Sequence, residues 1–146
     1  MTCCAGLDVE ALLALWDVPP STRSDAHGDF AAAYADPVLV NDRPTHVAEL
    51  VARAEALHAA FSDQSAELLE VVATDHHLAF AFRREGTHTG TWTTPLGDVP
   101  ATGARVVLSG IDILTVEGGK VTAIRVLADD LAVLGVAARL RLTERP

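Results

Sequence analysis

The stretch VVLSGIDILTVEGGKVTAIRVLADD, residues 106–130, has the pattern of two long β-strands joined by a tight turn at Gly118-Gly119. Alternate residues of its first half form two rows, and the row that contains Val106, Leu108 and Leu114 also contains Asp112. A buried carboxylate must find hydrogen-bond donors, keep its proton or face a polar part of a cavity, because an isolated buried charge is costly. Asp112 is therefore the first functional candidate, with a structural carboxylate hydrogen-bonded within the sheet as the alternative.

The rest of the chain changes from helical to strand periodicity near residue 66. Apolar spacing predicts three helices, at residues 7–16, at 24–34 with Ser24 or Asp25 as N-cap, and at 45–61 with Thr45 as N-cap. A final helix is predicted at residues 131–140, capped by Asp129 or Asp130. Strands are predicted at residues 38–40, 67–74, 78–92, 102–117 and 120–128, with turns at 75–77, 93–101 and 118–119.

This order of elements predicts an α+β fold. Three N-terminal helices would cover a strongly curved, mixed or antiparallel sheet, giving a cone with a pocket at its open end and a short C-terminal helix. The 146 residues fit one domain, residues 1–146, with residues 1–6 expected to be frayed.

Composition narrows the classes of partner. No apolar run approaches the roughly 20 residues of a membrane-spanning helix, so we expect no membrane partner. The net charge is −9 and no basic cluster is present, which excludes a typical nucleic-acid-binding surface. Adjacent Cys3 and Cys4 have no second pair, which indicates neither a disulfide framework nor a metal site. The first residues lack the pattern of a secretory signal, so a cytoplasmic location is expected.

Five short segments together resemble the SnoaL-like polyketide cyclase family of the nuclear-transport-factor-like superfamily. They are GTHTG at 86–90, PATG at 100–103, GIDI at 110–113, GKV at 119–121 and DDL at 129–131. The resemblance implies the cone-shaped fold, the binding of a small hydrophobic molecule and no cofactor.

Two further segments are similar to ketosteroid isomerases of the same superfamily. YADPVLVND, residues 34–42, is similar to the segment that ends in the proton-transferring aspartate, and this similarity places Asp42 on the base. IDIL, residues 111–114, is similar to the strand that carries a protonated aspartate, which implies that Asp112 donates a hydrogen bond to the enolate oxygen. That enzyme is a standard example of a carboxylic acid kept neutral by an apolar site.

The chain differs from both families at important positions. Trp16 replaces the tyrosine that ketosteroid isomerases carry on the first helix, and an indole donates one hydrogen bond but exchanges no proton. SnoaL-like cyclases carry their base just after a tryptophan on the last long strand, where this chain has Arg125-Val126.

The remaining candidates each have a functional and a structural interpretation. Asp42 is either an inward base or an exposed turn residue paired with Arg43. His88 shares a strand parity with Phe80, Phe82 and Trp92, and is either a proton shuttle or a core histidine. Asp129 is either an acid/base group or a helix N-cap.

The sequence favours proton transfer on a small hydrophobic carbonyl compound, such as a polyketide-like metabolite, because no nucleophile or cofactor motif is present. Asp42 would remove the proton and Asp112, helped by Trp16 or His88, would stabilise the enolate, leading to isomerisation or cyclisation. The expected substrate-lining residues are Trp16, Tyr34, Phe61, Phe80, Phe82 and Trp92.

Two alternatives remain open. The chain is a non-catalytic binding or dimerisation module if Asp42 and Asp112 do not share a cavity. It is an epoxide hydrolase of the limonene type if Arg125 bridges Asp112 and a second acid.

A homodimer is also expected. The predicted open sheet face carries Val107, Ile111, Ile113 and Val121, and so much apolar surface requires a cover. Arg83 and Arg84 are predicted to point to opposite faces of their strand, so that one of them reaches solvent or a partner.

Overall fold

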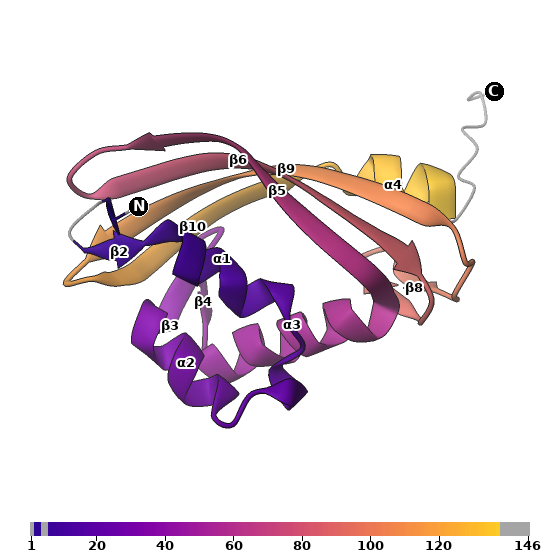
Figure 1. Ribbon diagram of the computed structural model, residues 1–146, viewed down its shortest axis with the longest axis horizontal. Helices are drawn as coiled ribbons and strands as arrows, with labels where there is room; N and C mark the ends of the chain where they lie inside the picture. Colours follow the sequence, from indigo (N-terminus) through magenta and orange to yellow (C-terminus); the bar gives the residue numbers. More distant parts are fainter. Residues whose placement is uncertain (1, 4–5, 138–146) are drawn as a thin grey trace.

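A curved six-stranded sheet covered on one face by three helices forms the body of the protein (Figure 1). In the computed structural model, the described residues are 2–3 and 6–137. The helices are α1 (Val9–Asp17), α2 (Ala26–Ala33), α3 (Val47–Ala60) and α4 (Asp130–Ala137), with a short 3₁₀ turn at Pro20–Thr22. The strands of the large sheet are β3 (Tyr34–Val40), β4 (Arg43–Thr45), β5 (Phe61–Ala73), β6 (His77–His88), β9 (Arg105–Glu117) and β10 (Lys120–Ala128).

The sheet has the order β4-β3-β10-β9-β6-β5, and every pair is antiparallel except β10–β3. We call the side that faces α1, α2 and α3 the inner face and the opposite side the outer face. Two further ribbons are small: β1 (Thr2–Cys3) pairs with β2 (Leu7–Asp8), and β7 (Trp92–Thr94) pairs with β8 (Gly97–Val99). The α+β cone and its mixed sheet therefore confirm the predicted fold class.

Local chemistry accounts for where the helices begin. The Asp8 side chain accepts hydrogen bonds from the first turn of α1, and the Asp25 side chain accepts one from Gly28 at the start of α2. The third helix begins one residue later than predicted, because His46 rather than Thr45 is its N-cap and forms a capping box with Glu49.

Several predicted boundaries were wrong. Strand β3 begins at Tyr34, which had been assigned to the second helix, and β5 begins at Phe61, directly after α3. The long strand predicted at residues 78–92 ends at His88, and the predicted turn at 93–101 contains most of the β7–β8 ribbon. The predicted last helix ends at Ala137 within the described residues, and residues 138–140 lie outside them. The prediction that residues 1–6 are frayed falls partly outside the described residues. Within them, Thr2–Cys3 pairs with Leu7–Asp8.

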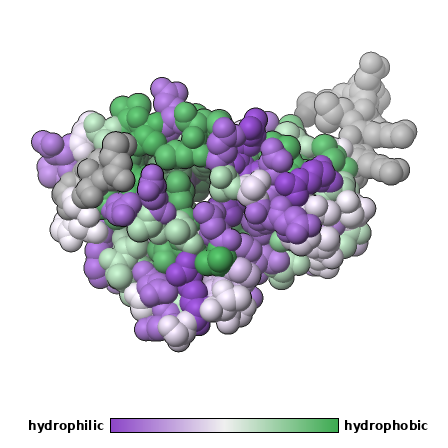
Figure 2. Space-filling model, viewed as in Figure 1, coloured by the Kyte–Doolittle hydropathy of each residue, from purple (hydrophilic) through white to green (hydrophobic). Residues whose placement is uncertain are grey.

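The main core lies between the inner face and the helices. Its fully buried members include Phe30 on α2, Leu50 on α3, Leu78 on β6 and Leu114 on β9. A second, smaller core lies toward α4 and includes Phe61 and Val106. In Figure 2, hydrophobic side chains gather over the strands, whereas the surface of the helices below them is mainly hydrophilic or intermediate. None of the described helices is both long and apolar enough to cross a membrane.

Val121 was expected on the outer face but is fully buried on the inner one. The register of β10 shifts between Val121 and Ala123, and such an irregularity moves a side chain to the other face.

Candidate functional site

Asp112 lies on the inner face in the middle of β9. Its neighbours across the strands are Phe80 on β6 and Val126 on β10. The carboxyl oxygen Oδ1 is buried and has no hydrogen-bond partner among the described residues. Burial of this group raises its pKa from 3.8 to about 6. The predicted placement of Asp112 on the row of Val106 and Leu114 is thus confirmed.

Trp16 and Tyr34 lie on the same inner side. The indole Nε1–H of Trp16 donates a hydrogen bond of 2.9 Å to the hydroxyl oxygen of Tyr34. The Phe30 ring packs against both, with ring centroids 5.4 Å from Trp16 and 6.0 Å from Tyr34. Because the indole occupies an acceptor position of the phenol oxygen, the hydroxyl proton of Tyr34 remains available for another acceptor.

The buried Tyr34 stays protonated at any physiological pH. Burial raises the pKa of Tyr34 most strongly, the hydrogen bond from Trp16 lowers it, and the nearby charge of Asp112 raises it again. Tyr34 is therefore a neutral hydrogen-bond donor in the same electrostatic environment as Asp112. We call Asp112, Tyr34 and Trp16 the carboxylate cluster.

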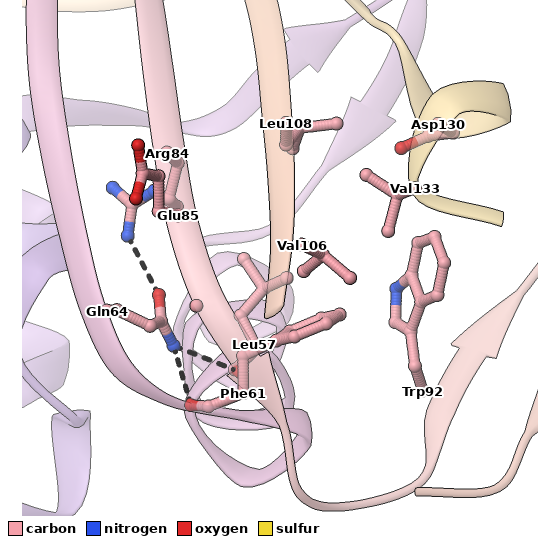
Figure 3. Close-up of a pocket in the computed structure, with 11 residues that line it drawn as sticks. Leu57, Phe61, Gln64, Arg84, Glu85, Trp92, Val106, Leu108, Asp130 and Val133 are labelled. Carbon is pink, nitrogen blue, oxygen red and sulfur yellow. Dashed lines mark hydrogen bonds between the residues drawn. The ribbon is translucent and has the colours of Figure 1, made fainter. Parts of the chain in front are cut away.

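A pocket of about 90 Å³ lies further along the inner face, between the sheet and α4. Its wall is largely apolar, with Leu57, Phe61, Trp92, Val106, Leu108 and Val133. Figure 3 shows Arg84 and Gln64 on one side of this pocket and Trp92, Val133 and Asp130 on the opposite side. We call it the mouth pocket.

The register of β6 and β9 relates the mouth pocket to Asp112. Successive inner pairs are Gly86 with Val106, Arg84 with Leu108, Phe82 with Gly110, and Phe80 with Asp112. The first two pairs line the mouth pocket, and the fourth contains the carboxylate. Phe82 and Gly110 lie between them, and a Cβ at position 110 would be only 2.5 Å from Cζ of Phe82. Glycine at 110 thus allows the Phe82 ring to lie flat across the strand next to Asp112.

Arg84 connects the mouth pocket to the carboxylate cluster. Its guanidinium donates to the carbonyl oxygen of Trp16 at 3.1 Å, to Gln64 Oε1 at 3.2 Å and to Asp17 Oδ1 at 3.2 Å. His58 Nε2 donates to the same Trp16 carbonyl at 2.9 Å. Arg84 and His58 thus hold the residue whose indole reaches Tyr34.

Gln64 completes this network. Its Nε2 shares its two N–H donors among three acceptors, the carbonyl oxygens of Leu57 and Phe61 at the end of α3 and Nδ1 of His58 at 3.2 Å. Since His58 Nδ1 accepts, the ring proton of neutral His58 lies on Nε2, which faces Trp16. Arg84, Gln64 and His58 were not among the predicted site residues.

Asp42 does not face the interior, and its predicted convergence with Asp112 is wrong. Its side chain is 73 % exposed on the outer side of the sheet, where Arg125 forms two hydrogen bonds with it, both 2.9 Å. This ion pair holds the pKa of the Asp42 carboxyl below its usual value. Asn41 and Asp42 both have positive φ, 49° and 66°, so the chain turns sharply here and strand alternation no longer applies.

Arg125 likewise does not bridge Asp112 and a second acid. It lies on the outer face of β10 and is 66 % exposed, whereas its neighbour Val126 faces Asp112. The arrangement expected of a limonene-type epoxide hydrolase is therefore not formed.

His88 occupies the predicted inner row of β6 but not the vicinity of Asp112. Eight residues separate it from Phe80, the neighbour of Asp112, which corresponds to about 26 Å along the strand. The fully buried ring packs on Phe61 at 5.3 Å, and Nδ1 lies 3.0 Å from the Thr102 hydroxyl. His88 thus lies buried at the far end of the cone, and its Nε2 has no hydrogen-bond partner among the described residues.

Asp129 is an exposed N-cap. Its carboxylate accepts a hydrogen bond of 3.1 Å from Ala132 N at the start of α4. This placement agrees with the structural interpretation of Asp129.

The expected substrate-lining residues fall into two groups on the inner side. Trp16 and Tyr34 belong to the carboxylate cluster, and Phe80 is paired with Asp112 across the strands. Phe61 and Trp92 line the mouth pocket. Phe82 lies between the two groups. Of the six residues, Phe61 and Trp92 line the mouth pocket, and substrate contact by the other four stays a prediction.

A curved mixed sheet with helices on its inner face is the cone-shaped fold of the nuclear-transport-factor-like superfamily. The family model of the SnoaL-like polyketide cyclases matches residues 9–135, and the chain belongs to this family. No curated protein matches the sequence significantly.

Solved structures show the same fold at low sequence identity. A SnoaL-like protein from Jannaschia sp. CCS1 has 19 % identity and a TM-score of 0.72, covering 91 % of this chain and 92 % of its own. TsrD from Streptomyces laurentii has 18 % identity and a TM-score of 0.71, with 92 % and 99 % covered. A SnoaL-like polyketide cyclase from Agrobacterium tumefaciens has 21 % identity and a TM-score of 0.66, with 85 % and 92 % covered.

Proposed function

We propose that this protein is an acid/base enzyme that removes a proton next to a carbonyl group of a small hydrophobic compound, with polyketide-like molecules as the substrate class. The observation that carries the proposal is the buried, unpaired Oδ1 of Asp112 on the inner face. A carboxyl group with a pKa of about 6 is a stronger base than an ordinary aspartate and is still largely ionised near neutral pH.

Each member of the carboxylate cluster has a role in this reaction. Ionised Asp112 takes the proton from the carbon next to the carbonyl. The Tyr34 hydroxyl donates a hydrogen bond to the carbonyl oxygen as it becomes an enolate, and the Trp16 indole fixes the orientation of the phenol. Asp112 replaces Asp42 as the base, because Asp42 lies on the other side of the sheet.

The enolate has two outcomes. In an isomerisation, Asp112 returns the proton to another carbon of the conjugated system. In a ring closure, the enolate carbon attacks a second carbonyl carbon, and the new alkoxide takes the proton from Asp112. Membership of a polyketide cyclase family supports the second outcome.

The position of Asp112 also supports its role. The resemblance to SnoaL-like cyclases places their base at Arg125-Val126, and Val126 is directly opposite Asp112 on the adjacent strand. This chain therefore presents a carboxylate to the same part of the inner face from the neighbouring strand.

Proton removal can be tested without knowledge of the natural substrate. In D₂O, NMR follows the exchange of the acidic CH₂ protons of a ketone such as 2-tetralone, whichever product would follow. We expect Asp112→Asn to reduce enzyme-dependent exchange about 10³-fold and Asp42→Asn to leave it within about twofold. Equal loss in both variants, or none in Asp112→Asn, would contradict the assignment of the base.

A non-catalytic binding module is the second candidate, because the two acids expected to act together lie on opposite faces of the sheet. The same assay separates the two functions. Ketones that shift the NMR signals of the wild-type protein but exchange no faster than in buffer would favour the binding module.

We further propose that the outer face pairs with a second copy of the chain. Five apolar side chains on β3, β9 and β10 are exposed there: Leu39, Val107, Ile111, Ile113 and Leu127. Leu127 is 79 % exposed and Ile111 54 %, and an apolar surface of this kind marks an interaction site.

A further inference from the structure

Arg84 places a cation in the largely apolar mouth pocket. Its side chain is only 17 % exposed and makes three hydrogen bonds, to Trp16 O, Gln64 Oε1 and Asp17 Oδ1. A guanidinium has five N–H donors. Within the described part of the chain, its Nε–H and one Nη2–H are left for another acceptor.

The adjacent residue Arg83 shows how a fully neutralised arginine differs. Arg83 lies on the outer face, is 46 % exposed, and forms ion pairs with two carboxylates, Glu67 and Glu85. Among the described residues, Arg84 has one carboxylate partner, Asp17, which is itself 47 % exposed and bonds through one oxygen. Arg84 is thus the less neutralised and the more buried of the two.

We propose that Arg84 is the specificity-determining residue of the mouth pocket and binds the carboxylate of a ligand whose ring lies against Phe61 and Trp92. The binding of a carboxylate at Arg84 does not depend on the proposed function, but the link between this ligand and the reaction at Asp112 rests on it. Arginine binds a carboxylate through two parallel N–H donors, and a low-exposure site strengthens such bonds.

The charges around the pocket orient such a ligand. Two carboxylates line the pocket with Arg84: Asp130 lies across from it, and Glu85 lies beside it (Figure 3). Glu85 is paired with Arg105 at 3.4 Å and Arg83 at 3.9 Å, so the charge of Asp130 is the less compensated of the two and directs an anion to the Arg84 side. The ring is then directed to the apolar side, next to Trp92 and Val133.

The register also sets the length of the substrate. Arg84 is paired with Leu108, four residues from Asp112, which corresponds to about 13 Å along β9. A substrate that uses both sites must extend along this part of β9, past Phe82 and Gly110. The inferred class is an extended, ring-containing carboxylic acid with a ketone at the opposite end.

Benzoate and benzamide form a matched pair of probes, because they share one shape and differ in charge. The protein has two tryptophans, Trp16 and Trp92, so two indole N–H signals report on the two parts of the inner face. Titration by heteronuclear NMR, with Trp92→Phe to assign the signals, measures the affinity of each probe at the mouth pocket.

We expect benzoate to bind about tenfold more tightly than benzamide and to shift the Trp92 signal, as a charge-assisted hydrogen bond predicts. Arg84→Gln should bind the two probes equally, and Arg83→Gln should keep the wild-type preference. Equal affinity of the two probes in the wild-type protein would overturn the proposal without reference to any variant. An equal loss in Arg83→Gln and Arg84→Gln would also overturn it, because it would indicate a general effect of charge.

Two checks separate this proposal from loss of structure and from the proposed reaction. Arg84→Lys keeps the charge and should retain part of the preference for benzoate, which a fold defect alone would not restore. Asp112→Asn should bind benzoate as the wild type does. If the wild-type protein prefers benzoate but does not accelerate ketone exchange, the proposed reaction is rejected and the anion site is retained. If it accelerates exchange but binds benzoate and benzamide equally, the anion site alone is rejected.

Discussion

Near Asp112, the two faces of β9 reverse the usual distribution of side chains, with a charged group inside and apolar groups outside. On the inner face, Asp112 lies in a row with buried Val106, Leu114 and Val116. On the outer face, Ile111 and Ile113 on either side of it are 54 % and 45 % exposed. A buried carboxylate and exposed isoleucines both reduce stability, so each needs a compensation that the isolated fold does not supply.

We interpret this inversion as the basis for two different proposed partners, one for each face. The inner carboxylate, with an unpaired oxygen, suits a substrate that offers a proton. The outer isoleucines suit another apolar surface. Substitutions that act on one face and not on the other test this division of roles.

After the loss of the base in Asp112→Asn, the largest effect is expected from Tyr34→Phe. This change removes the hydroxyl proposed to stabilise the enolate, and it leaves the ring that stacks on Phe30. We expect ketone exchange to fall about 100-fold, the size of effect typical for loss of one oxyanion donor. The measurement is the rate of deuterium incorporation at saturating ketone.

Thr122→Val is a matched control for loss of a hydroxyl, because within residues 2–3 and 6–137 the Thr122 hydroxyl bonds to one backbone carbonyl, Thr115 O, at 3.4 Å. It should leave exchange unchanged. A Tyr34→Phe protein with wild-type exchange would show that the phenol does not participate.

The second effect concerns stability. Folding raises the pKa of Asp112 from 3.8 to about 6, so the folded state prefers the protonated acid. The penalty for ionising it is absent below about pH 4, grows as pH rises toward 6, and is complete above about pH 7. Asp112→Asn should therefore raise the free energy of unfolding by about 3 kcal/mol at pH 8.

Urea denaturation of both proteins at about pH 4 and pH 8 measures this difference, and the other titrating groups cancel in the comparison. A gain that is equal at both pH values would show that the carboxyl group is not destabilised by burial. Increased stability combined with lost exchange is the expected signature of a functional acid.

Much of the fold follows from local patterns in the sequence. Alternation along β9 predicted Asp112 on the inner face, and alternation along β6 placed its aromatic residues on one side. Apolar spacing located α1, α2 and α3. The direct transition from α3 to β5 was not predictable, because no glycine or proline marks the junction between Ala60 and Phe61. The shift at Val121 was missed because it arises from pairing between strands and has no local signal.

The site was predictable only where strand alternation extends without interruption. The similarity to ketosteroid isomerases suggested an inward Asp42, but two positive φ angles end the strand before it and turn the side chain away from the interior. The approach of Tyr34 to Asp112 depends on the parallel pairing of β3 with β10, which joins distant segments. Arg84 did carry a signal, since it shares the inner parity of Phe80 and Phe82.

The smallest effect concerns the outer face. Ile111→Thr keeps a β-branched side chain, so the strand should remain intact while apolar surface is lost. If a second copy covers this face, the dimer should dissociate about tenfold more readily, and analytical ultracentrifugation over a concentration series measures this change. Exchange at the inner face should remain within about twofold.

Val18→Thr is a suitable control, because Val18 is 43 % exposed at the end of α1, on the helical side of the molecule. It removes a comparable apolar group and should leave the association constant unchanged. Equal dissociation in both variants would indicate that general hydrophobicity drives association. A wild-type protein that stays monomeric at all concentrations would show that no second copy of this chain covers the outer isoleucines. The exposure of Ile111 and Ile113 would then require another explanation.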